Sequence, residues 1–543
     1  MTHVIGQGCC NDASCVAVCP VQCIRPRPGD PEFTTTEQLY IDPASCIDCG
    51  ACANVCPVEA IHHADSLPLA LQPFGDINAD YFAAHPLQDV SPPSIKRRRL
   101  ATGSTLTVAI VGSGPSAMYA ASELSEIEGC QVTVVERQPV PYGLVRAGVA
   151  PDHHRTKLVA EGWGRILRRP TVECLFNVEV GRDVTVQELL DHHHAVVWAA
   201  GSSDDRKLGI GGEDLPGVVS AREFVAWYNG HPDFAHQTFD LSGKRAVIIG
   251  NGNVALDVAR ALAQSPTVYE RTSMSNLALK ALRASAIEEV QVIGRRGQAH
   301  AAYGTAELIA LSRLEGVDLL ADPQEVTVTD EELAAATADS ESKPFERRRA
   351  VVDAASRREQ SSMRRVLLRF RQTPVELLGI DAVKAIVLTD PAGTRETVET
   401  SLVIRSVGFR GRPAPDLPFD EAAGVIPNEA GRITDPNTGL PLPGLYCSGW
   451  IKRGSTGVIG TNRVDSEETV NSLLEDVRED RVPQPTGTPE QLIYIVRSRG
   501  LNVVDAAGWH RIDEAEKAGG QATGRDRLKF LSFERMVQEA RDS

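Results

Sequence analysis

The sequence predicts an α/β protein with two Rossmann-like dinucleotide-binding domains, preceded by a small, cysteine-rich α+β domain. Three observations carry this prediction. A glycine-rich turn follows the apolar stretch 106–111, a second such turn follows 246–249, and nine of the twelve cysteines lie within the first 56 residues. A chain of 543 residues, 42% of them hydrophobic, is long enough for three or four domains.

The first glycine-rich turn contains Gly112, Gly114 and Ala117. The first glycine permits the tight turn, the second lets backbone N–H groups approach a pyrophosphate, and the small Ala117 lets the next helix pack closely on the strand. A second apolar strand, 131–135, ends at Glu136, about 20 residues after the glycines, where an acid accepts a hydrogen bond from a ribose 2′-OH. Together these features predict a dinucleotide site.

The formal net charge of −16 argues against nucleic acid and anionic membranes as general partners, since both repel an acidic protein. The N-terminus has neither a basic start nor an apolar run, so we expect no targeting segment. No apolar run approaches the roughly 18 residues of a membrane helix. The protein is therefore expected to be soluble and cytoplasmic, with no membrane insertion.

The second cysteine run, Cys46, Cys49, Cys52 and Cys56, has the spacing C-x2-C-x2-C-x3-C. Thiolates at this spacing hold three corners of an iron–sulfur cube, and the fourth cysteine ligates the other cluster in proteins with two clusters. Cys19 is the reciprocal donor, so a [4Fe-4S] site with Cys19, Cys46, Cys49 and Cys52 is predicted. Disulfides or zinc fit less well, because no secretion signal is present and zinc sites more often use two separated pairs.

The first run departs from this pattern, because Asp12 stands at the second ligand position and Cys10 lies beside the first. Three thiolates, Cys9, Cys15 and Cys56, remain for this cluster. That number favours a [3Fe-4S] centre, or a labile [4Fe-4S] centre whose fourth iron is held by Asp12, Cys10 or water. The sequence leaves these alternatives open.

With both runs described, residues 1–87 resemble the bacterial two-cluster ferredoxins of the seven-iron type. The likeness covers both cysteine runs, the strand 39–43 and the tail 76–82. We expect Cys23 to be a buried free thiol near the cluster. Acidic side chains outnumber basic ones in this region, as suits a carrier that docks on a basic face. Residues 88–105, with their Pro, Ser and Arg content, are expected to be a linker.

The second glycine-rich turn, with Gly250 and Gly252, again follows a strand and precedes a helical pattern. At the end of the next strand, Arg295 and Arg296 replace the acid that would select NAD, and two guanidiniums match the 2′-phosphate of NADP. That strand begins about 40 residues after the glycines instead of the usual ~20, so a helical insertion over 264–288 is expected.

Residues 106 to about 530 resemble the adrenodoxin-reductase-like ferredoxin–NADP reductases. The likeness covers G-S-G-P-S-A, the loop from Tyr142 to His153, G-N-G-N-V-A-L-D, G-R-R-G, and G-W-I-K-R-G-x-T-G-V-I-G-T-N. One departure is 298–302, because the family usually has a proline after G-R-R-G. The resemblance implies FAD contacts at Ala117, Glu136, Leu144, Val180, Trp450, Gly457, Val458 and Ile459. It implies NADP contacts at Asn251, Gly252, Asn253, Val254, Arg295, Arg296, Glu307 and Gly457.

These resemblances give the expected domain order. A ferredoxin domain (1–87) and a linker (88–105) precede a discontinuous FAD domain (106–204 and 414–543), into which an NADP domain (205–413) is inserted. Asp152, His153 and Glu307 are expected beside the chemistry in a supporting role. The segment 326–365 is expected to be a surface elaboration without chemistry, and His192, His193 and His194 to be solvent-exposed.

The resemblance implies a ferredoxin–NADP reductase with a fused ferredoxin. NADPH would reduce FAD, and single electrons would pass through the clusters to an external acceptor, such as a cytochrome P450 or another ferredoxin-dependent enzyme. Two alternatives remain. One is an iron–sulfur flavoprotein subunit that feeds a dedicated partner enzyme, and the other is a reductase whose cluster domain senses redox state.

Overall fold

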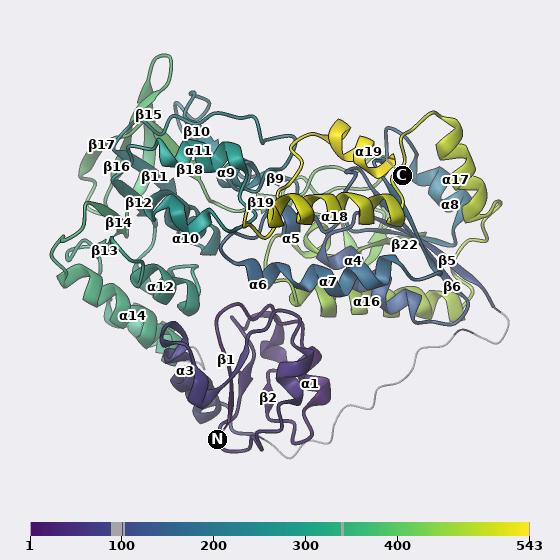
Figure 1. The fold of residues 1–543 in the computed structure, drawn as a ribbon, viewed down its shortest axis with the longest axis horizontal. Helices are drawn as coiled ribbons and strands as arrows, with labels where there is room; N and C mark the ends of the chain where they lie inside the picture. Colours follow the sequence, from purple (N-terminus) through teal and green to yellow (C-terminus); the bar gives the residue numbers. More distant parts are fainter. Residues whose placement is uncertain (1, 88–99, 101–103, 338–341, 542–543) are drawn as a thin grey trace.

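The computed structural model describes residues 2–87, 100, 104–337 and 342–541 (Figure 1). It contains a small N-terminal module, formed by residues up to 87, and two larger α/β bodies, each built around a sheet with parallel strands. Figure 1 shows the module below both bodies, between α14 (Ser342–Arg357) and α16 (Thr461–Arg478). The predicted fold class, two Rossmann-like bodies after a small α+β domain, is confirmed.

The first body has a seven-stranded sheet, and β5 is the middle one of its five parallel strands. The strand order is β20 (Asn428–Glu429), β21 (Arg432–Thr434), β22 (Pro441–Cys447), β8 (Ala195–Trp198), β5 (Leu106–Val111), β6 (Cys130–Glu136) and β7 (Val172–Phe176). The strands from β22 to β7 are parallel, and all of β5 is buried, as expected for a strand covered on both faces. The chain therefore leaves this sheet after β8 and returns to it at β20.

Helices cover both faces of the first sheet. They are α4 (Pro115–Ser125), α5 (Gly143–Ala147), α6 (His154–Lys157), α7 (Val159–Leu167), α8 (Val186–His192), α15 (Trp450–Arg453), α16, α17 (Pro489–Ser498), α18 (Ala506–Gln521) and α19 (Phe533–Arg541). Helices α4 and α16 come from opposite ends of the chain and pack against each other. Their apolar side chains share one core with β5 and β6, which holds the two chain segments together.

The second body has a six-stranded, fully parallel sheet. The strand order is β10 (Val218–Ser220), β18 (Leu402–Arg405), β11 (Arg245–Ile249), β12 (Glu289–Ile293), β14 (Arg364–Arg369) and β13 (Val317–Ala321). Its helices are α9 (Ala221–Tyr228), α10 (Asn253–Ala263), α11 (Asn276–Arg283), α12 (Thr305–Ser312), α13 (Asp330–Thr337) and α14. The predicted insertion over 264–288 contains the short helix η4 (Pro266–Tyr269) and α11, so a helical insertion is confirmed.

Smaller elements complete the two bodies. The antiparallel sheet β15 (Thr373–Gly379), β16 (Val383–Thr389) and β17 (Arg395–Glu399) flanks the second body, where η5 (Gln298–His300) also lies. The short pair β9 (Asp204–Asp205) and β19 (Phe409–Arg410) lies where the chain crosses between the bodies. None of the helices in the part of the chain that the structure describes combines the length and the apolar character that a membrane span requires.

The N-terminal module consists of two short antiparallel strand pairs and three helices. The pairs are β1 (His3–Ile5) with β4 (Ile61–His63) and β2 (Ile24–Arg25) with β3 (Tyr40–Ile41), and the helices are α1 (Ser14–Val18), α2 (Ala51–Val55) and α3 (Pro73–Ala84), with short turns η1 (Pro31–Thr34), η2 (Ala64–Ser66) and η3 (Leu69–Leu71). The buried Asn78 joins α3 to the strands, because its amide accepts from Ile5 N (3.2 Å) and Ile41 N (2.8 Å). The tail of the module is thereby fixed to its core.

The expectation that 326–365 is only a surface elaboration is wrong for α14. Phe345 and Val352 of this helix are buried in the second body, and Arg347 and Arg348 face the N-terminal module. The expectation of solvent exposure is also wrong for His193, which is fully buried and hydrogen-bonded to Thr133 and to the carbonyl of Leu189.

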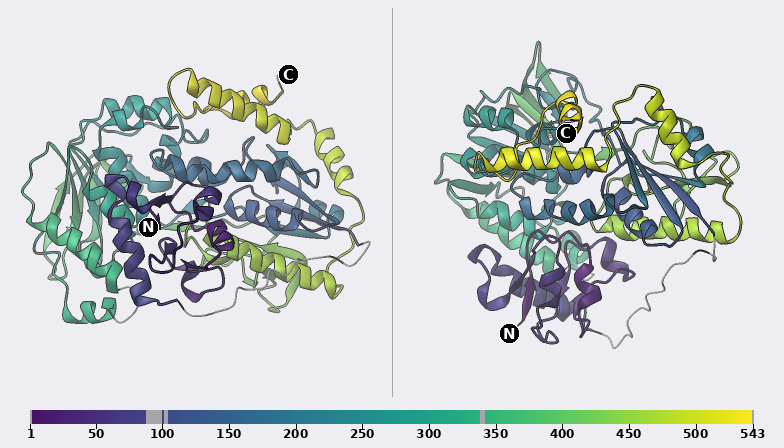
Figure 2. Two further views of the ribbon diagram at one scale, coloured as in Figure 1. Left: turned by 60° about the horizontal axis from the view of Figure 1, so that its bottom comes forward. Right: turned by 45° about the vertical axis from the view of Figure 1, so that its right-hand side comes forward.

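Glu37 of the module binds the second body at the beginning of α12. Its carboxylate accepts from the backbone N–H of Thr305 (2.8 Å) and from the Arg348 guanidinium (2.9 Å). Nearby, the Arg347 guanidinium donates to the Asp80 carboxylate. An acid at a helix N-terminus satisfies an otherwise unpaired N–H and meets the positive end of the helix dipole. The module is thus held on the second body by its own acidic side chains. Figure 2 shows the module next to the second body from two further sides.

Replacing Glu37 with Arg is expected to loosen this contact, because the new guanidinium would face Arg348 and the positive end of α12. Amide hydrogen exchange at Thr305 should accelerate, and the radius of gyration from small-angle X-ray scattering should rise. Combining Glu37→Arg with Arg348→Glu should restore part of the protection. Asp65→Arg, the same charge change at an exposed position of the module, is the control. Unchanged exchange at Thr305 in Glu37→Arg would show that the contact does not hold the module.

Candidate functional site

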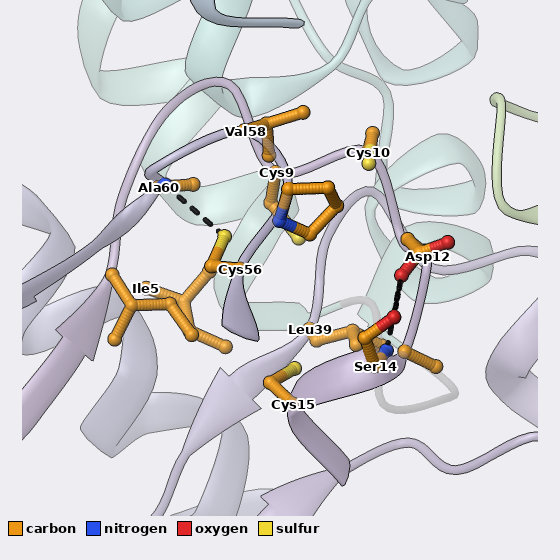
Figure 3. Close-up of a pocket in the computed structure, with 13 residues that line it drawn as sticks. Ile5, Cys9, Cys10, Asp12, Ser14, Cys15, Leu39, Cys56, Val58 and Ala60 are labelled. Atoms are coloured by element: carbon orange, nitrogen blue, oxygen red, sulfur yellow. Dashed lines mark hydrogen bonds between the residues drawn. The ribbon is translucent and has the colours of Figure 1, made fainter. Parts of the chain in front are cut away.

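Two cavities in the N-terminal module are lined by cysteines (Figure 3 shows the first). The first cavity contains Cys9, Cys10, Cys15 and Cys56, with Asp12 at its edge, and the second contains Cys19, Cys23, Cys46, Cys49 and Cys52. Every cysteine of the chain lies in the described residues and is a free thiol. The last cysteine of each run lies in the cavity of the other run, which is the arrangement that the spacing predicts.

In the first cavity Cys10 and Cys15 are buried, and Cys9 and Cys56 are half-buried. Burial raises the pKa of Cys9 to about 11 and holds that of Cys15 well above its usual range. The backbone N–H of Ala60 donates to the Cys56 sulfur at 3.3 Å. Several buried thiols become thiolates only when a cation compensates their charge, so the donor set fits a bound iron–sulfur cluster.

In the second cavity, Cys19 and Cys23 lie with their sulfur atoms 3.5 Å apart. The hydrogen bond from Cys23 lowers the pKa of Cys19 to about 6, whereas burial raises the pKa of Cys52 to about 11. Cys23 is buried, as predicted, and Cys49 is exposed to solvent. The four cysteines expected to bind the [4Fe-4S] cluster are therefore together, with a fifth thiol beside them.

The first glycine-rich turn lies where β5 meets α4. Gly112 has φ +104, and a Cβ there would lie 2.6 Å from the carbonyl oxygen of Ala199, so only glycine fits. A Cβ at Gly114 would meet no atom within 4 Å, which leaves open space where a pyrophosphate would lie. Glu136, at the end of β6, accepts hydrogen bonds from the N–H and hydroxyl of Ser113, so the acid predicted to bind the ribose faces this turn.

The C-terminal segment implied for FAD binding packs against α4, the helix that follows the first glycine-rich turn. Helix α15 begins at Trp450, whose indole ring stacks on Phe409 (5.6 Å between centroids). Asp465 of α16 accepts from Gly449 N and from the Ser448 hydroxyl, and the latter also bonds to Ser116 of α4 (2.6 Å). This buried network joins the segment around Trp450 to the helix that follows the first glycine turn.

The remaining residues implied for FAD binding are placed as follows. Ala117 is fully buried in α4, Leu144 is 40% exposed in α5, and Val180 is buried near Trp198. Gly457, Val458 and Ile459 precede α16, and Val458 N donates to the Thr461 hydroxyl (3.1 Å). Leu144 and Val180 thus lie in different environments, one at the surface and one in the core.

The second glycine-rich turn lies between β11 and α10. Gly250 has φ +114, and a Cβ there would overlap the carbonyl of Ser406. The Asn253 side chain accepts a hydrogen bond from Gly304 N (2.7 Å), which joins this turn to the loop before α12. Asn251, Gly252 and Val254 are the neighbours of Asn253 along the chain. Arg295 and Arg296 follow β12 and are both exposed, so they are free to meet a phosphate.

Asp152, His153 and Glu307 gather around one buried guanidinium, that of Arg260. Arg260 binds Asp152 (2.7 Å), His153 (2.7 Å) and Glu307 (3.2 Å), and also Asp257 (2.7 Å) one turn earlier on α10. Burial alone would raise the pKa of Asp152, but the Arg260 charge lowers it overall. Burial raises the pKa of Asp257 to about 6.

Arg260 and Asp257 are functional candidates that the sequence reasoning missed. The available signal was a charged pair three residues apart on an otherwise apolar helix. Since the guanidinium lies between the acids and His153, these groups form an ionic network without requiring a metal ion. The network joins the loop before α6, in the first body, to α10 and α12 of the second.

Two family models match the chain. Residues 106–452 match the pyridine nucleotide-disulphide oxidoreductase family, and residues 7–60 match the 4Fe-4S dicluster domain. The first match covers both glycine-rich turns and the Arg260 network, and the second covers both cysteine runs. The matches thus divide the chain as the two predicted resemblances do.

Curated relatives match over nearly the whole chain. The probable ferredoxin/ferredoxin–NADP reductase of Mycobacterium tuberculosis (strain ATCC 25618 / H37Rv) is 46% identical over 552 aligned residues, which cover 99% of this chain and 95% of the relative. Human mitochondrial NADPH:adrenodoxin oxidoreductase is 38% identical and covers 82% of this chain, with 94% of the relative matched.

The reductase part also matches solved structures. Mycobacterium tuberculosis FprA in complex with NADPH has a TM-score of 0.74 and 40% identity, and the match covers 80% of this chain and all of that one. The remaining fifth of the chain corresponds in size to the N-terminal module and the segment after it. The chain therefore belongs to the ferredoxin/ferredoxin–NADP reductases of the pyridine nucleotide-disulphide oxidoreductase family, in which a dicluster ferredoxin domain precedes the reductase.

Proposed function

We propose that the chain is an NADPH-dependent ferredoxin reductase that carries its own ferredoxin as the built-in electron acceptor. The observation that carries the proposal is the position of the first cysteine-lined cavity. Its loop packs on Gly460, directly after the residues Gly457 to Ile459 implied for FAD binding, with Gly460 N donating to the carbonyl of Cys10 (2.7 Å). The donor sets for metal clusters and for a flavin nucleotide therefore adjoin each other within one chain.

The proposed cofactors are FAD, NADP(H), one [4Fe-4S] cluster and one further cluster, which is a [3Fe-4S] or a labile [4Fe-4S] centre. When bound, FAD and the clusters would supply the redox chemistry that lets the two electrons of an NADPH hydride leave singly. FAD would lie on the turn Gly112–Gly114 with its ribose at Glu136, and NADP on the turn Gly250–Gly252 with its 2′-phosphate at Arg295 and Arg296. The ordinary ligands of the [4Fe-4S] cluster would be Cys19, Cys46, Cys49 and Cys52, and those of the other cluster Cys9, Cys15 and Cys56.

The protein's own contribution is positioning. Arg260 holds Asp152 and His153, at the end of the loop from Tyr142 to His153, against Glu307 of α12. A hydride transfer requires the nicotinamide ring of NADPH to contact the flavin ring. A misplacement of about 1 Å can cost roughly a hundredfold in rate. We therefore assign Asp152, His153 and Glu307 to positioning, with no general acid–base pair.

Further parts of the proposal concern the chain as a whole. The domain boundaries proposed are 1–87, 106–204 with 414–543, and 205–413, with 88–105 as the linker; most of that linker lies outside the described residues. The proposed location is the cytoplasm. The final acceptor would be a redox protein with a basic face, such as a cytochrome P450 or another ferredoxin-dependent enzyme, because the module is acidic.

The function is tested by mixing anaerobic, cluster-reconstituted protein with NADPH in a stopped-flow instrument. Flavin bleaching should be followed by cluster reduction at a rate independent of protein concentration, with EPR of the frozen product confirming the reduced clusters. The control is the chain without residues 1–100, which should bleach but reduce no cytochrome c. Oxidised clusters beside a reduced flavin would contradict the proposal and favour the redox-sensing alternative.

Substituting Arg295 and Arg296 with Ala should weaken NADPH binding by roughly tenfold or more per residue, because each removes a charge-assisted hydrogen bond to the 2′-phosphate. The KM for NADH, which lacks that phosphate, should change little. Steady-state kinetics with both nucleotides measure this, and Arg283→Ala, an exposed arginine of the same body, is the control. An equal loss with NADPH and NADH would mean that the two arginines do not select the phosphate.

Replacing Cys49 with Ser should remove the [4Fe-4S] cluster and lower the iron content by about four atoms per chain. The matched variant Cys23→Ser removes a thiol from the same cavity and should leave the iron content unchanged. Iron and acid-labile sulfide assays on anaerobically purified protein measure both. An equal loss of iron in the two variants would make Cys23 a ligand and the assignment wrong.

A further inference from the structure

Asp12 occupies a ligand position by the internal symmetry of the module. The two cysteine runs have matching backbones: Asn11 and Asp48 have φ of 57 and 58, and Ala13 and Gly50 have φ of 63 and 71. Helices α1 and α2 begin directly after these residues. Asp12 therefore stands where the second run has Cys49, and a carboxylate at that place could in principle ligate iron.

Both carboxylate oxygens of Asp12 are, however, already bound to protein donors. The Tyr119 hydroxyl donates to Oδ2 (2.9 Å), and Ser14 donates to Oδ1 through both its backbone N–H (3.2 Å) and its hydroxyl. Figure 3 shows the bonds between Asp12 and Ser14 at the edge of the cavity, on the side opposite Cys56. A turn of the carboxylate toward an iron atom would break these bonds.

Two of the partners belong to the helices of the first body. Tyr119 lies on α4, and Arg463 lies on α16, where its guanidinium donates to the Asp12 carbonyl (2.6 Å) and lies 4.0 Å from the carboxylate. Tyr119 is only 6% exposed. Burial and the adjacent Asp12 charge hold the pKa of Tyr119 well above its usual range, so the hydroxyl keeps its proton and remains a donor.

The backbone on either side of Asp12 is packed as closely as its side chain. Gly460 N donates to the Cys10 carbonyl (2.7 Å), and a Cβ at Gly460 would overlap the carbonyl of Asn11. Cys10 is 3% exposed and belongs to the apolar core of the first body. The loop is thus held by its backbone contact with Gly460, by the burial of Cys10 and by the bonds of Asp12, which supply the charged contact.

We infer that Asp12 is not an iron ligand but the anchor by which α4 and α16 hold the first cysteine loop against the reductase. The inference rests on the proposed function, since it removes the carboxylate as a fourth ligand beside Cys9, Cys15 and Cys56 and so favours a three-iron centre. Ligation by Asp12 would leave the buried Tyr119 hydroxyl without its acceptor, which is costly inside a protein. The residue at the ligand position has thereby become a positioning residue.

Three variants test the inference: Asp12→Ala, Tyr119→Phe and, as the control, Asp48→Ala. Asp48 lies at the equivalent of Asn11 in the second run and bonds to His3 and His63 of the module instead of the reductase. Amide exchange at Gly460, which reports the bond to Cys10, should accelerate roughly tenfold in Asp12→Ala and in Tyr119→Phe, because each loses a hydrogen bond to a charged group. Asp48→Ala should leave it unchanged.

Iron content gives the second measurement. Asp12→Ala and Tyr119→Phe should both keep the wild-type iron and sulfide content and the EPR signal of the first cluster, because no ligand is lost. Loss of about one iron atom in Asp12→Ala alone would make Asp12 a ligand and overturn the inference. Unchanged exchange at Gly460 in both variants would overturn the anchor role.

Failure of the proposed function and failure of the anchor role would give different results. Wild-type protein that binds no iron after anaerobic reconstitution would refute the proposed function, while the exchange experiment would still decide whether Asp12 anchors the loop. If Asp12→Ala fails to fold, the exchange at Gly460 in Tyr119→Phe decides whether Asp12 anchors the loop. That variant removes only one hydroxyl and leaves the carboxylate free to ligate.

Discussion

The contact between the Cys10–Asp12 loop and Gly460 fixes where the N-terminal module lies. Two backbones meet there without a side chain between them, so the distance is set by van der Waals contact and one hydrogen bond. Ile459, one residue earlier, packs in the same apolar cluster as Cys9 and Cys56. Any shift of the module would therefore open that cluster to water, and the first cavity stays beside the segment implied for FAD. The second cavity, with the exposed Cys49, lies in the same module but outside this contact.

Arg260 plays the corresponding part between the two nucleotide-binding bodies. Removing a buried charge from water is costly, and the cost is offset only when several partners satisfy the group. Asp152, Asp257 and Glu307 do so here, and they come from three separate segments. The guanidinium thus requires the bodies to approach in one geometry, because in any other it would remain buried without its partners. This is a physical reason for α10, which follows the second glycine turn, to carry a charged residue on a buried face.

Sequence patterns predicted the features that depend on local spacing. Strand, glycine turn and helix recur at Gly112 and Gly250 because close backbone approach tolerates no larger residue, and the cysteine intervals placed the right thiols in each cavity. Pairings between distant segments were not predictable. Glu37 with Thr305, Asp12 with Tyr119 and Arg260 with Asp152 each join residues far apart in the chain, and a charged residue alone does not reveal its partner. His193 was missed for a similar reason, since its burial depends on Thr133 of another strand.

These long-range pairs form one contiguous set of contacts across the molecule. Glu37 of the module binds the first N–H of α12, two residues before Glu307 on the same helix. Glu307 binds Arg260, and Arg260 binds Asp152 and His153 in the first body. On the other side of the module, Asp12 returns to that body through Tyr119 and Arg463. The module therefore closes a ring of contacts that runs through both nucleotide-binding bodies. A reductase without a ferredoxin domain lacks the Glu37 and Asp12 contacts, so in this chain the ferredoxin adds a second link between the two bodies besides the one at Arg260.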